Sequence, residues 1–465
     1  MPASPFPSSV HTLVVGAGFA GIAAAIAVRR ANPSADVLLI ERADEVGGTW
    51  RDNTYPGCAC DVPTSLYSFS FAPSSEWSHT FARQPEIHRY LRHVVDANGL
   101  RPHLLTGCEL LGARWNDATH RWHVDTSRGP ITARVLVAAT GALSTPKLPA
   151  VPGLDSFTGT VFHSASWNHA HDLTGERIGV VGTGASAVQF VPEIVDRAAH
   201  LTVFQRTPAW VMPRLDRTRS RLERVLYRRL PLTQKFVRGL VYTYREGYVA
   251  LLAHATAVLP LVERVARILL RLQVRDRALR RALTPDFTIG CKRNLLTNDW
   301  LPTLARPDVT VVTGGLTEVI PTGVRDVDGQ HHDLDTIIFA TGFTPTEPPI
   351  AHLLTGADGK TLAQHWTGSP NAHLGTTVAG FPNLFLMYGP NTNLGHSSIV
   401  YMLESQAAYL ADALKVMCND GITRLAVRPD AKRHTTLGST TRCRTRYGTP
   451  VDAPAGTSMP KVETR

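Results

Sequence analysis

Two glycine-rich loops in this chain have the residue types and spacing that bind dinucleotide phosphates. Each follows a short apolar run; the first is Gly16-Ala17-Gly18-Phe19-Ala20-Gly21 and the second is Gly182-Thr183-Gly184-Ala185-Ser186-Ala187. In the first loop, Gly16 permits a tight turn, Gly18 lets the backbone approach a pyrophosphate, and Gly21 lets a helix pack closely on a strand. The amides at the N-terminus of that helix face the phosphates. The loops therefore predict two bound nucleotides.

The residues that end the second strand of each loop unit differ in charge. Glu41 lies where a carboxylate can accept hydrogen bonds from a ribose diol, so the first site should bind FAD or NAD. At the equivalent position the second unit has Gln205-Arg206-Thr207 and no acid. A guanidinium pairs with a 2′-phosphate that an acid would repel, so the second nucleotide should be NADPH. Together the two sites imply a flavin that NADPH reduces.

The elements that must hold the loops form two βαβ units. Residues 11–41 and 177–205 each contain an apolar strand, a glycine turn, a helix and a second strand. Two further strands, 135–139 and 336–340, lead into the same Ala-Thr-Gly tripeptide, which indicates where the chain crosses between domains. We expect an α/β fold of two Rossmann-like dinucleotide-binding domains, one inserted in the other. The expected FAD domain comprises residues 1–145 and 345–465, and the NADPH domain residues 146–344.

The positive charge of the chain is concentrated in residues 214–281. This segment has 17 Arg and Lys against five Asp and Glu, whereas the rest of the chain has 31 against 33. Its apolar spacing predicts basic amphipathic helices, which form a helical insertion over residues 214–285 of the NADPH domain. Two interpretations stay open: an insertion whose arginine face is solvated, or peripheral contact with a membrane surface or an acidic partner. Because no recognised nucleic-acid-binding module is present, no nucleic-acid partner is expected.

Composition and cysteine spacing argue against several other classes of protein. No apolar segment reaches membrane-spanning length, no signal peptide is evident, and no metal site is expected. The six cysteines lack a staple-like spacing, which indicates reduced thiols and a cytoplasmic location. Cys58-Ala59-Cys60 leaves a flavin disulfide reductase open as an alternative, although its single intervening residue differs from the CxxC of such enzymes. Otherwise the reduced flavin would pass its electrons to dioxygen.

Two longer patterns resemble the class B flavoprotein monooxygenases, and specifically the Baeyer–Villiger monooxygenases. The segment from Phe157 to Trp167 fits that family's pattern FxGxxxHxxxW, and only Asn168 departs from the Pro or Asp that follows it. Trp167 favours this branch over the flavin monooxygenases that oxidise nitrogen and sulfur. A second family pattern, Gly-Gly-x-Trp followed by Tyr-Pro-Gly and an aspartate, is matched in full by residues 47–61. The resemblance covers residues from about 11 to about 415.

This resemblance implies roles for individual residues. Arg293 would stabilise the peroxide anion of the flavin, with Asp61 as its carboxylate partner beside the flavin, and Lys292 would hold the 2′-phosphate of NADPH. Further FAD contacts are expected at Gly48, Thr49, Trp50 and Tyr67, and further NADPH contacts at Thr183, Gly184, Ser186, Gln189, Arg206 and Thr207. Leu394 and His396, in a segment that would close over the flavin, are candidate substrate contacts.

The implied activity is FAD- and NADPH-dependent monooxygenation. One oxygen atom of dioxygen would enter a ketone through a C4a-peroxyflavin and give an ester or lactone. The alternatives are N- or S-oxygenation by an enzyme of the same class, the disulfide reductase, and a non-catalytic flavin protein held at membranes by the basic insertion. The expected partners are a small ketone or heteroatom substrate and dioxygen.

Overall fold

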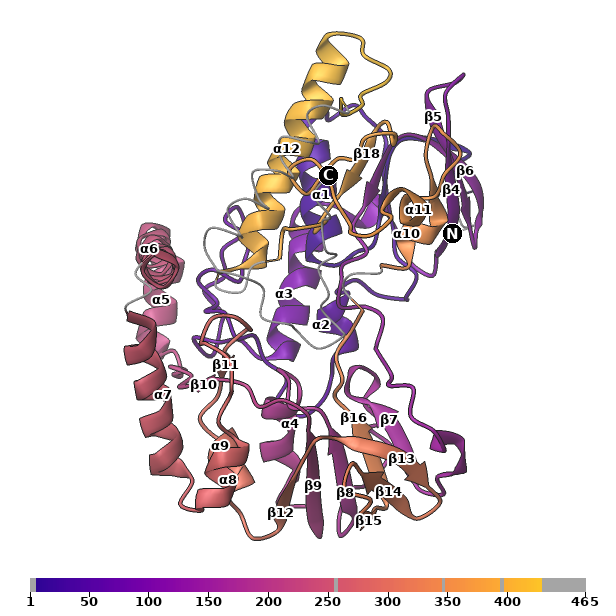
Figure 1. Ribbon diagram of the computed structural model, residues 1–465. Helices are drawn as coiled ribbons and strands as arrows, with labels where there is room; N and C mark the ends of the chain where they lie inside the picture. Colours follow the sequence, from indigo (N-terminus) through magenta and orange to yellow (C-terminus); the bar gives the residue numbers. More distant parts are fainter. Residues whose placement is uncertain (1–5, 255–257, 345–347, 394–396, 429–465) are drawn as a thin grey trace, which may run out of the picture.

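Two sheets, one above the other in Figure 1, carry the two glycine loops. The computed structural model describes residues 6–254, 258–344, 348–393 and 397–428 (Figure 1). Within these residues, none of the helices has the length and apolar character that crossing a membrane requires.

The upper sheet has the strand order β17-β4-β5-β6-β1-β2-β3, and β18 also pairs with β6. Its strands are β1 (Ser9–Val15), β2 (Val37–Ile40), β3 (Leu104–Leu105), β4 (Leu110–Asn116), β5 (Arg121–Thr126), β6 (Gly129–Ala138), β17 (Leu354–Thr355) and β18 (Leu384–Leu386). β1 pairs in parallel with β2 and β6. β1 is apolar throughout its second half because both of its faces are buried: Val14 packs in one core and Leu13 in another.

Helices lie on both faces of this sheet. On one face, the long helices α1 (Phe19–Ala31), α3 (Gln84–Ala97) and α12 (Ile399–Asn419) share a core with Val14, and the short helix α2 (Thr49–Asp52) contributes Trp50 to its edge. On the other face, the short helices α10 (Ile350–Leu353) and α11 (Leu362–His365) share a core with Leu13. α12 lies alongside α1 (Figure 1), and small residues such as Ala24 and Ala407 allow the two helices to approach closely. The helix that follows the first glycine loop is therefore fixed from two sides, by the sheet and by α12.

The lower sheet is entirely parallel, in the order β12-β9-β8-β16-β7. Its strands are β7 (Thr160–His163), β8 (Arg177–Val181), β9 (His200–Gln205), β12 (Val309–Thr313) and β16 (Thr336–Phe339). A small antiparallel sheet of β13 (Leu316–Ile320), β14 (Gly323–Asp326) and β15 (His331–Asp333) packs against it. α4 (Ala187–Ile194) follows the second glycine loop, and α9 (Trp300–Leu304) packs beside it.

The path of the chain confirms the predicted fold class. After β16 the chain returns to the upper sheet as β17 and β18, so the lower unit is inserted within the upper one. β18 pairs with β6, which the chain left before it entered the lower unit. The mixed α/β fold thus has two Rossmann-like units with the second inserted in the first.

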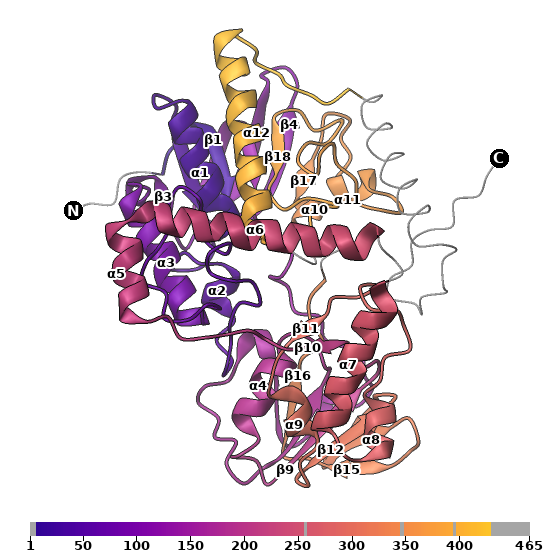
Figure 2. The same ribbon diagram turned by 90° about the vertical axis from the view of Figure 1, so that its left-hand side faces the viewer.

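The basic segment is helical, as predicted, and forms an outer layer on one side of the molecule. It contains α5 (Arg221–Arg229), α6 (Pro231–His254), α7 (Leu259–Gln273) and α8 (Arg277–Ala282), and it is closed by the paired strands β10 (Val211–Met212) and β11 (Leu295–Leu296). Figure 2 shows α6 across the upper unit and α7 in front of the lower one. The expectation of a solvated arginine face is only partly correct, because Arg238 of α6 points inward and bonds to the carbonyl oxygens of Ser65 and Ser68.

Candidate active site

The first glycine loop is packed so tightly that side chains cannot replace two of its three glycines. Gly16 has φ +101°, and a Cβ there would lie 2.6 Å from the carbonyl oxygen of Ala139. A Cβ on Gly21 would lie 1.7 Å from the carbonyl oxygen of Gly16. Gly18 is less crowded, with the Cα of Gly48 as its nearest neighbour at 3.7 Å. The backbone amides at the N-terminus of α1 are therefore not covered by side chains, and a pyrophosphate can approach them closely.

The second glycine loop repeats one of these contacts. Gly182 has φ +112°, and a Cβ there would lie 2.5 Å from the carbonyl oxygen of Ala340. Ala139 and Ala340 both begin the repeated Ala-Thr-Gly tripeptide, so each tripeptide packs against the first glycine of its own loop. Sequence reasoning noticed the repeat but assigned it only to the domain crossings. Around Gly184 no atom lies within 4 Å of a built Cβ, so this part of the loop is open.

A cavity of about 290 Å³ opens beside the first loop. Its lining includes most of the residues predicted to contact FAD: Gly16, Gly18, Phe19, Ala20, Glu41, Gly48, Thr49, Trp50 and Tyr67. Gly21 does not line it, because this glycine packs beneath the loop. The lining also includes residues that were not predicted, among them Thr140, Gly141 and Leu403. The repeated Ala-Thr-Gly was the available signal for the first two. Tyr388, which also lines the cavity, begins the segment 388–396 that was expected to close over the flavin.

Glu41 is held rigidly at the end of β2. Its carboxylate accepts hydrogen bonds from the backbone amides of Ala17, at 2.8 Å, and Ala43, at 3.1 Å. Arg51 donates to the same group at 3.0 Å. A carboxylate has about four acceptor positions, so Glu41 can also accept from a ribose hydroxyl. The bond to Ala17 ties this acid directly to the glycine loop.

Aromatic side chains form one wall of the cavity. The Trp50 indole nitrogen donates to the hydroxyl oxygen of Tyr67 at 2.8 Å, and the Phe19 and Tyr67 rings meet edge to face with centroids 5.2 Å apart. Trp50 itself is fixed through its carbonyl oxygen, which accepts from Gln84. The wall is therefore a preorganised aromatic surface, against which a ring system can pack.

Asp61 and Arg293 form an ion pair that joins the two units. The Nη2 atom of Arg293 lies 2.7 Å and 2.6 Å from the two carboxylate oxygens of Asp61. Burial opposes the charge of Arg293, but the attraction of Asp61 and the hydrogen bond to it outweigh this effect and raise the pKa of the guanidinium. Because the side chain is still 46% exposed, the cation can face both its partner and a substrate.

The environment of this pair connects it to the cavity. Burial raises the pKa of Tyr388, and the nearby charge of Arg293 opposes that shift. Neither Arg293 nor Asp61 lines the cavity, but Tyr388 does, so the charge of Arg293 acts on a residue of the cavity wall. Arg245 of α6 approaches from the other side and donates to the backbone oxygen of Asp61 at 3.5 Å. The loop with Arg293 and the insertion thus both contact Asp61, one at its carboxylate and the other at its backbone oxygen.

Arg206, Thr207 and Lys292 lie on two neighbouring segments of the lower unit. The segments are tied together by the parallel pairing of β10 with β11 and by the Trp210 indole, which donates to Phe287 O at 2.8 Å. Arg206 and Lys292 are exposed, and within the described residues neither has a carboxylate within 4 Å. The Thr183 hydroxyl donates to Thr207 O at 3.4 Å, so the second glycine loop meets the first of these segments.

Gln189 has a position that the sequence did not predict. Its amide oxygen accepts from the Tyr55 hydroxyl at 3.1 Å and from the Ala59 amide at 3.2 Å, and its amide nitrogen donates to Ala59 O at 2.9 Å. Its side chain therefore links α4 to the loop before Asp61. Ser186 ends the second glycine loop directly before α4. The predicted substrate contacts Leu394 and His396 lie outside the described residues.

Known proteins match this chain over most of its length. A family model described as pyridine nucleotide-disulphide oxidoreductase matches residues 13–230. A Baeyer-Villiger monooxygenase of Streptomyces coelicolor is 50% identical over 426 residues, which are 91% of this chain and 82% of that protein. A Baeyer-Villiger monooxygenase of Pseudomonas aeruginosa is 45% identical over 92% of this chain and 82% of its own length.

The chain belongs to the Baeyer–Villiger monooxygenase family. A solved structure, the OTEMO complex with FAD and NADP, matches it with a TM-score of 0.85 and 28% identity, covering 94% of this chain and 90% of the other. The resemblance inferred from the two sequence patterns is confirmed by these relatives, and so is the architecture of two nucleotide-binding units.

The residue that departs from the Baeyer–Villiger monooxygenase pattern has a local explanation. The side-chain oxygen of Asn168 accepts from the Ala170 amide at 3.2 Å and closes a turn directly after Trp167. An aspartate makes the same turn, so the substitution preserves the backbone. Trp167 packs between Phe162 and Phe190, with ring centroids 5.1 Å and 5.2 Å away. Trp167 therefore fixes the segment after β7 against Phe190 of α4.

The thiols of this Baeyer–Villiger monooxygenase do not fit disulfide chemistry. Cys58 and Cys60 are buried and free. Burial raises the pKa of Cys58 to about 11, and burial together with the charge of Asp61 raises that of Cys60 well above its usual range. Because the thiolate is the reactive form, both are poor nucleophiles at neutral pH.

We therefore expect the double variant Cys58→Ser and Cys60→Ser to oxidise NADPH at nearly the wild-type rate. The measurement is steady-state NADPH consumption with a ketone, normalised to bound flavin, and Cys108→Ser is the matched control because Cys108 is also a buried free thiol. Loss of activity in the double variant alone, at unchanged flavin content, would support the disulfide reductase instead.

Proposed function

We propose that this chain is an FAD- and NADPH-dependent monooxygenase that inserts one oxygen atom of dioxygen into a ketone and gives an ester or lactone. The observation that carries the proposal is the Asp61–Arg293 ion pair, which joins the two nucleotide-binding units beside the cavity. The reaction balances as ketone, dioxygen, NADPH and a proton giving ester, water and NADP⁺. Two electrons come from NADPH, and the second oxygen atom leaves as water.

The residues around the cavity fit FAD. The glycines of the first loop leave room for a pyrophosphate, Glu41 can accept from a ribose, and the wall of Trp50 and Tyr67 suits a ring system. When bound and reduced by NADPH, FAD supplies the activated oxygen for this reaction. Gly184, Arg206 and Lys292 are the groups of the second unit that we assign to NADPH, with Thr183, Ser186, Gln189 and Thr207 around them.

Arg293 is the residue that we assign to stabilising negative charge on oxygen. A guanidinium does not act as an acid at neutral pH, so it favours an anionic oxygen nucleophile without protonating it. It also stabilises the negative oxygen of the tetrahedral carbon adduct, since a preorganised cation costs no reorganisation during the reaction. Asp61 holds the guanidinium in one orientation through two short contacts.

The rival activity within the family is oxygenation of nitrogen or sulfur. Such a reaction needs a protonated, electrophilic oxygen, which a fixed cation disfavours. Purified protein should be incubated with NADPH and a panel of ketones, amines and sulfides, and the products analysed by mass spectrometry. We expect esters from at least one class of ketone. Turnover of amines or sulfides with no ester from a broad ketone panel would overturn the proposal.

The 2′-phosphate assignment predicts a change in coenzyme preference. Replacing Arg206 or Lys292 with Gln should raise the KM for NADPH by about tenfold to 100-fold, because each substitution removes a charge-assisted contact. The KM for NADH should change little. Steady-state kinetics with both coenzymes measure this, and Arg325→Gln is a control because Arg325 lies on β14 of the same unit. Equal losses with NADPH and NADH would show that the two residues do not recognise the phosphate.

Three further features are part of the proposal. We place the domain boundaries near residues 145 and 345, since the repeated Ala-Thr-Gly tripeptides lie just before them. A reducing compartment such as the cytoplasm fits the five free cysteines of the described residues. In addition to a ketone and dioxygen, we propose an anionic surface as a partner of the basic insertion, on the ground of its excess of positive charge.

A further inference from the structure

The insertion carries most of the large apolar side chains that are exposed in the described part of the chain. Of 21 large hydrophobic residues that are exposed in the described part of the chain, 13 lie between Leu215 and Leu272. On α6 they recur at every fourth position and on α7 at three- or four-residue intervals: Leu232, Phe236, Leu240, Tyr244, Leu261, Val265, Ile268 and Leu272. We call these eight residues the outer face. Patches of this kind mark contact sites for proteins or membranes.

α6 exposes an apolar stripe and turns polar groups toward the upper unit, beside partly buried apolar side chains of the same helix. Gln234 is buried and donates to the Ser74 carbonyl oxygen at 2.7 Å, and Arg238 donates to carbonyl oxygens of the upper unit. In contrast, Leu232 is 77% exposed and Phe236 is 68% exposed. The inward polar residues satisfy the backbone beneath them, so the helix cannot simply rotate to bury its leucines. The outer face is therefore available to a partner that offers an apolar surface.

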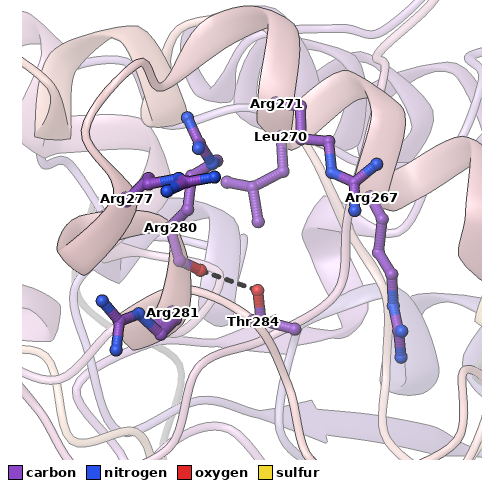
Figure 3. Close-up of a pocket in the computed structure, with 7 residues that line it drawn as sticks. All are labelled: Arg267, Leu270, Arg271, Arg277, Arg280, Arg281 and Thr284. Atoms are coloured by element: carbon purple, nitrogen blue, oxygen red, sulfur yellow. Dashed lines mark hydrogen bonds between the residues drawn. The ribbon is translucent and has the colours of Figure 1, made fainter.

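α7 and α8 form a second feature next to this face, a pocket lined by arginines. The pocket measures about 530 Å³ and is lined by five arginines, Leu270 and Thr284; the arginines are Arg267, Arg271, Arg277, Arg280 and Arg281 (Figure 3). Arg267 pairs with Glu263 at 3.5 Å, and Arg280 donates to the backbone oxygens of residues 274 and 275. For Arg271, Arg277 and Arg281, the described residues provide no carboxylate within 4 Å.

The two features belong to one surface. Arg271 lies next to Leu272 and three residues after Ile268, so α7 presents apolar and cationic side chains on adjoining sides. Figures 1 and 2 agree that α6 and α7 lie on the same side of the molecule. An uncompensated cluster of guanidinium groups attracts anions, and apolar side chains beside it favour a medium with a hydrocarbon interior. An anionic lipid bilayer offers both.

Other occupants match this surface less well. A second copy of the chain would bring two insertions together, each with an excess of 12 positive charges. Residues 429–465 contain seven Arg and Lys and only three Asp and Glu, so they have the wrong charge. Nucleic acid would pair with the arginines but leave the apolar outer face in water.

We propose that α6, α7 and α8 dock the enzyme on anionic membranes, with the outer face at the acyl boundary and the arginine pocket around a lipid phosphate. This deepens the anionic-surface contact proposed above and does not depend on ketone oxygenation. It brings the active site near lipid because Arg245 of the same α6 contacts Asp61. Hydrophobic ketones that partition into membranes are then the favoured substrate class.

Co-sedimentation of the full-length holoenzyme with vesicles tests this inference. Vesicles of phosphatidylcholine alone are compared with vesicles of phosphatidylcholine and phosphatidylglycerol, at low and high salt. We expect binding only to the anionic vesicles and weaker binding at high salt. No binding to anionic vesicles at low salt, or equal binding to neutral ones, would overturn the proposal.

Two sets of variants separate the apolar and cationic contributions. The apolar variant combines Ile268→Asp with Leu272→Asp. The cationic variant combines Arg271→Gln, Arg277→Gln and Arg281→Gln. We expect each variant to lower vesicle partitioning by on the order of 100-fold. The matched controls change exposed residues elsewhere: Val416→Asp, and Arg89→Gln with Arg114→Gln and Arg128→Gln. Controls should bind as wild type. Equal losses in the controls would contradict a dedicated docking surface.

Two further readouts keep the result interpretable. Ester formation from a water-soluble ketone, measured without vesicles, should be unchanged in every variant, which shows that the variants fold and that docking is separate from catalysis. Size-exclusion chromatography with light scattering reports the oligomeric state. A wild-type dimer that Ile268→Asp and Leu272→Asp convert to a monomer would assign the outer face to a second copy and overturn membrane docking.

Discussion

Arg293→Ala is expected to abolish ester formation, with a loss of about 100-fold to 1000-fold or more, while reduction of the flavin by NADPH stays largely intact. The physical reason is that the guanidinium interacts with negative charge that develops on oxygen, and hydride transfer creates no such charge at this position. Asp61 holds Arg293 in place through contacts with both of its carboxylate oxygens.

The two half-reactions of Arg293→Ala can be measured separately. Anaerobic stopped-flow absorbance follows flavin reduction, and gas chromatography follows the ester in air. Arg325→Ala is a matched control, because Arg325 is also ion-paired and about half exposed but lies on β14, away from the cavity. Asp61→Asn should give a smaller loss, since the cation remains but is less firmly oriented. Ester formed at the wild-type rate by Arg293→Ala would remove this residue from the mechanism.

Gly21→Ala is expected to lower the affinity for FAD by on the order of 100-fold, and the purified protein should lack the yellow colour of flavin. The added methyl would lie 1.7 Å from the carbonyl oxygen of Gly16, so either α1 or the glycine loop must move. Because Gly21 packs beneath the loop, the effect arises from displacement of the loop and not from a lost contact with FAD.

Gly112→Ala is the control for this substitution. Gly112 lies within β4 of the same sheet, and a Cβ there meets no atom within 4 Å. Flavin content is measured by absorbance after purification, and affinity by titration of the apoprotein. Circular dichroism establishes whether the variant is folded. A folded Gly21→Ala protein that retains a full complement of FAD would contradict the packing argument.

The parts of the site that the sequence predicted are those encoded locally. A glycine loop between a strand and a helix needs only about 30 neighbouring residues to be recognised. Glu41 and Arg206 could be placed because each follows the second strand of such a unit, and the structure puts both at those strand ends. Asp61 and Arg293 are 232 residues apart, so only the family resemblance brought them together.

The parts that could not be predicted depend on contacts between distant segments. Ala139 supports Gly16 across the sheet, and Gln189 bonds to Ala59 across the two units, and neither contact follows from local spacing. α6 shows a different limit. Its periodicity indicates that its sides differ in polarity, but not which side turns inward. The inward side is the one that carries Gln234 and Arg238, because these side chains donate hydrogen bonds to the carbonyl oxygens of residues 65, 68 and 74.

The central claim is that an atom of dioxygen enters a ketone under the control of the Asp61–Arg293 pair. Its most direct test is turnover of a ketone with NADPH under ¹⁸O₂, with mass spectrometry of the product. The account predicts one ¹⁸O atom in the ester or lactone of the wild-type protein, and at least about 100-fold less labelled ester from Arg293→Ala at equal flavin content. Unlabelled product, or labelled ester at the same rate from both proteins, would contradict it.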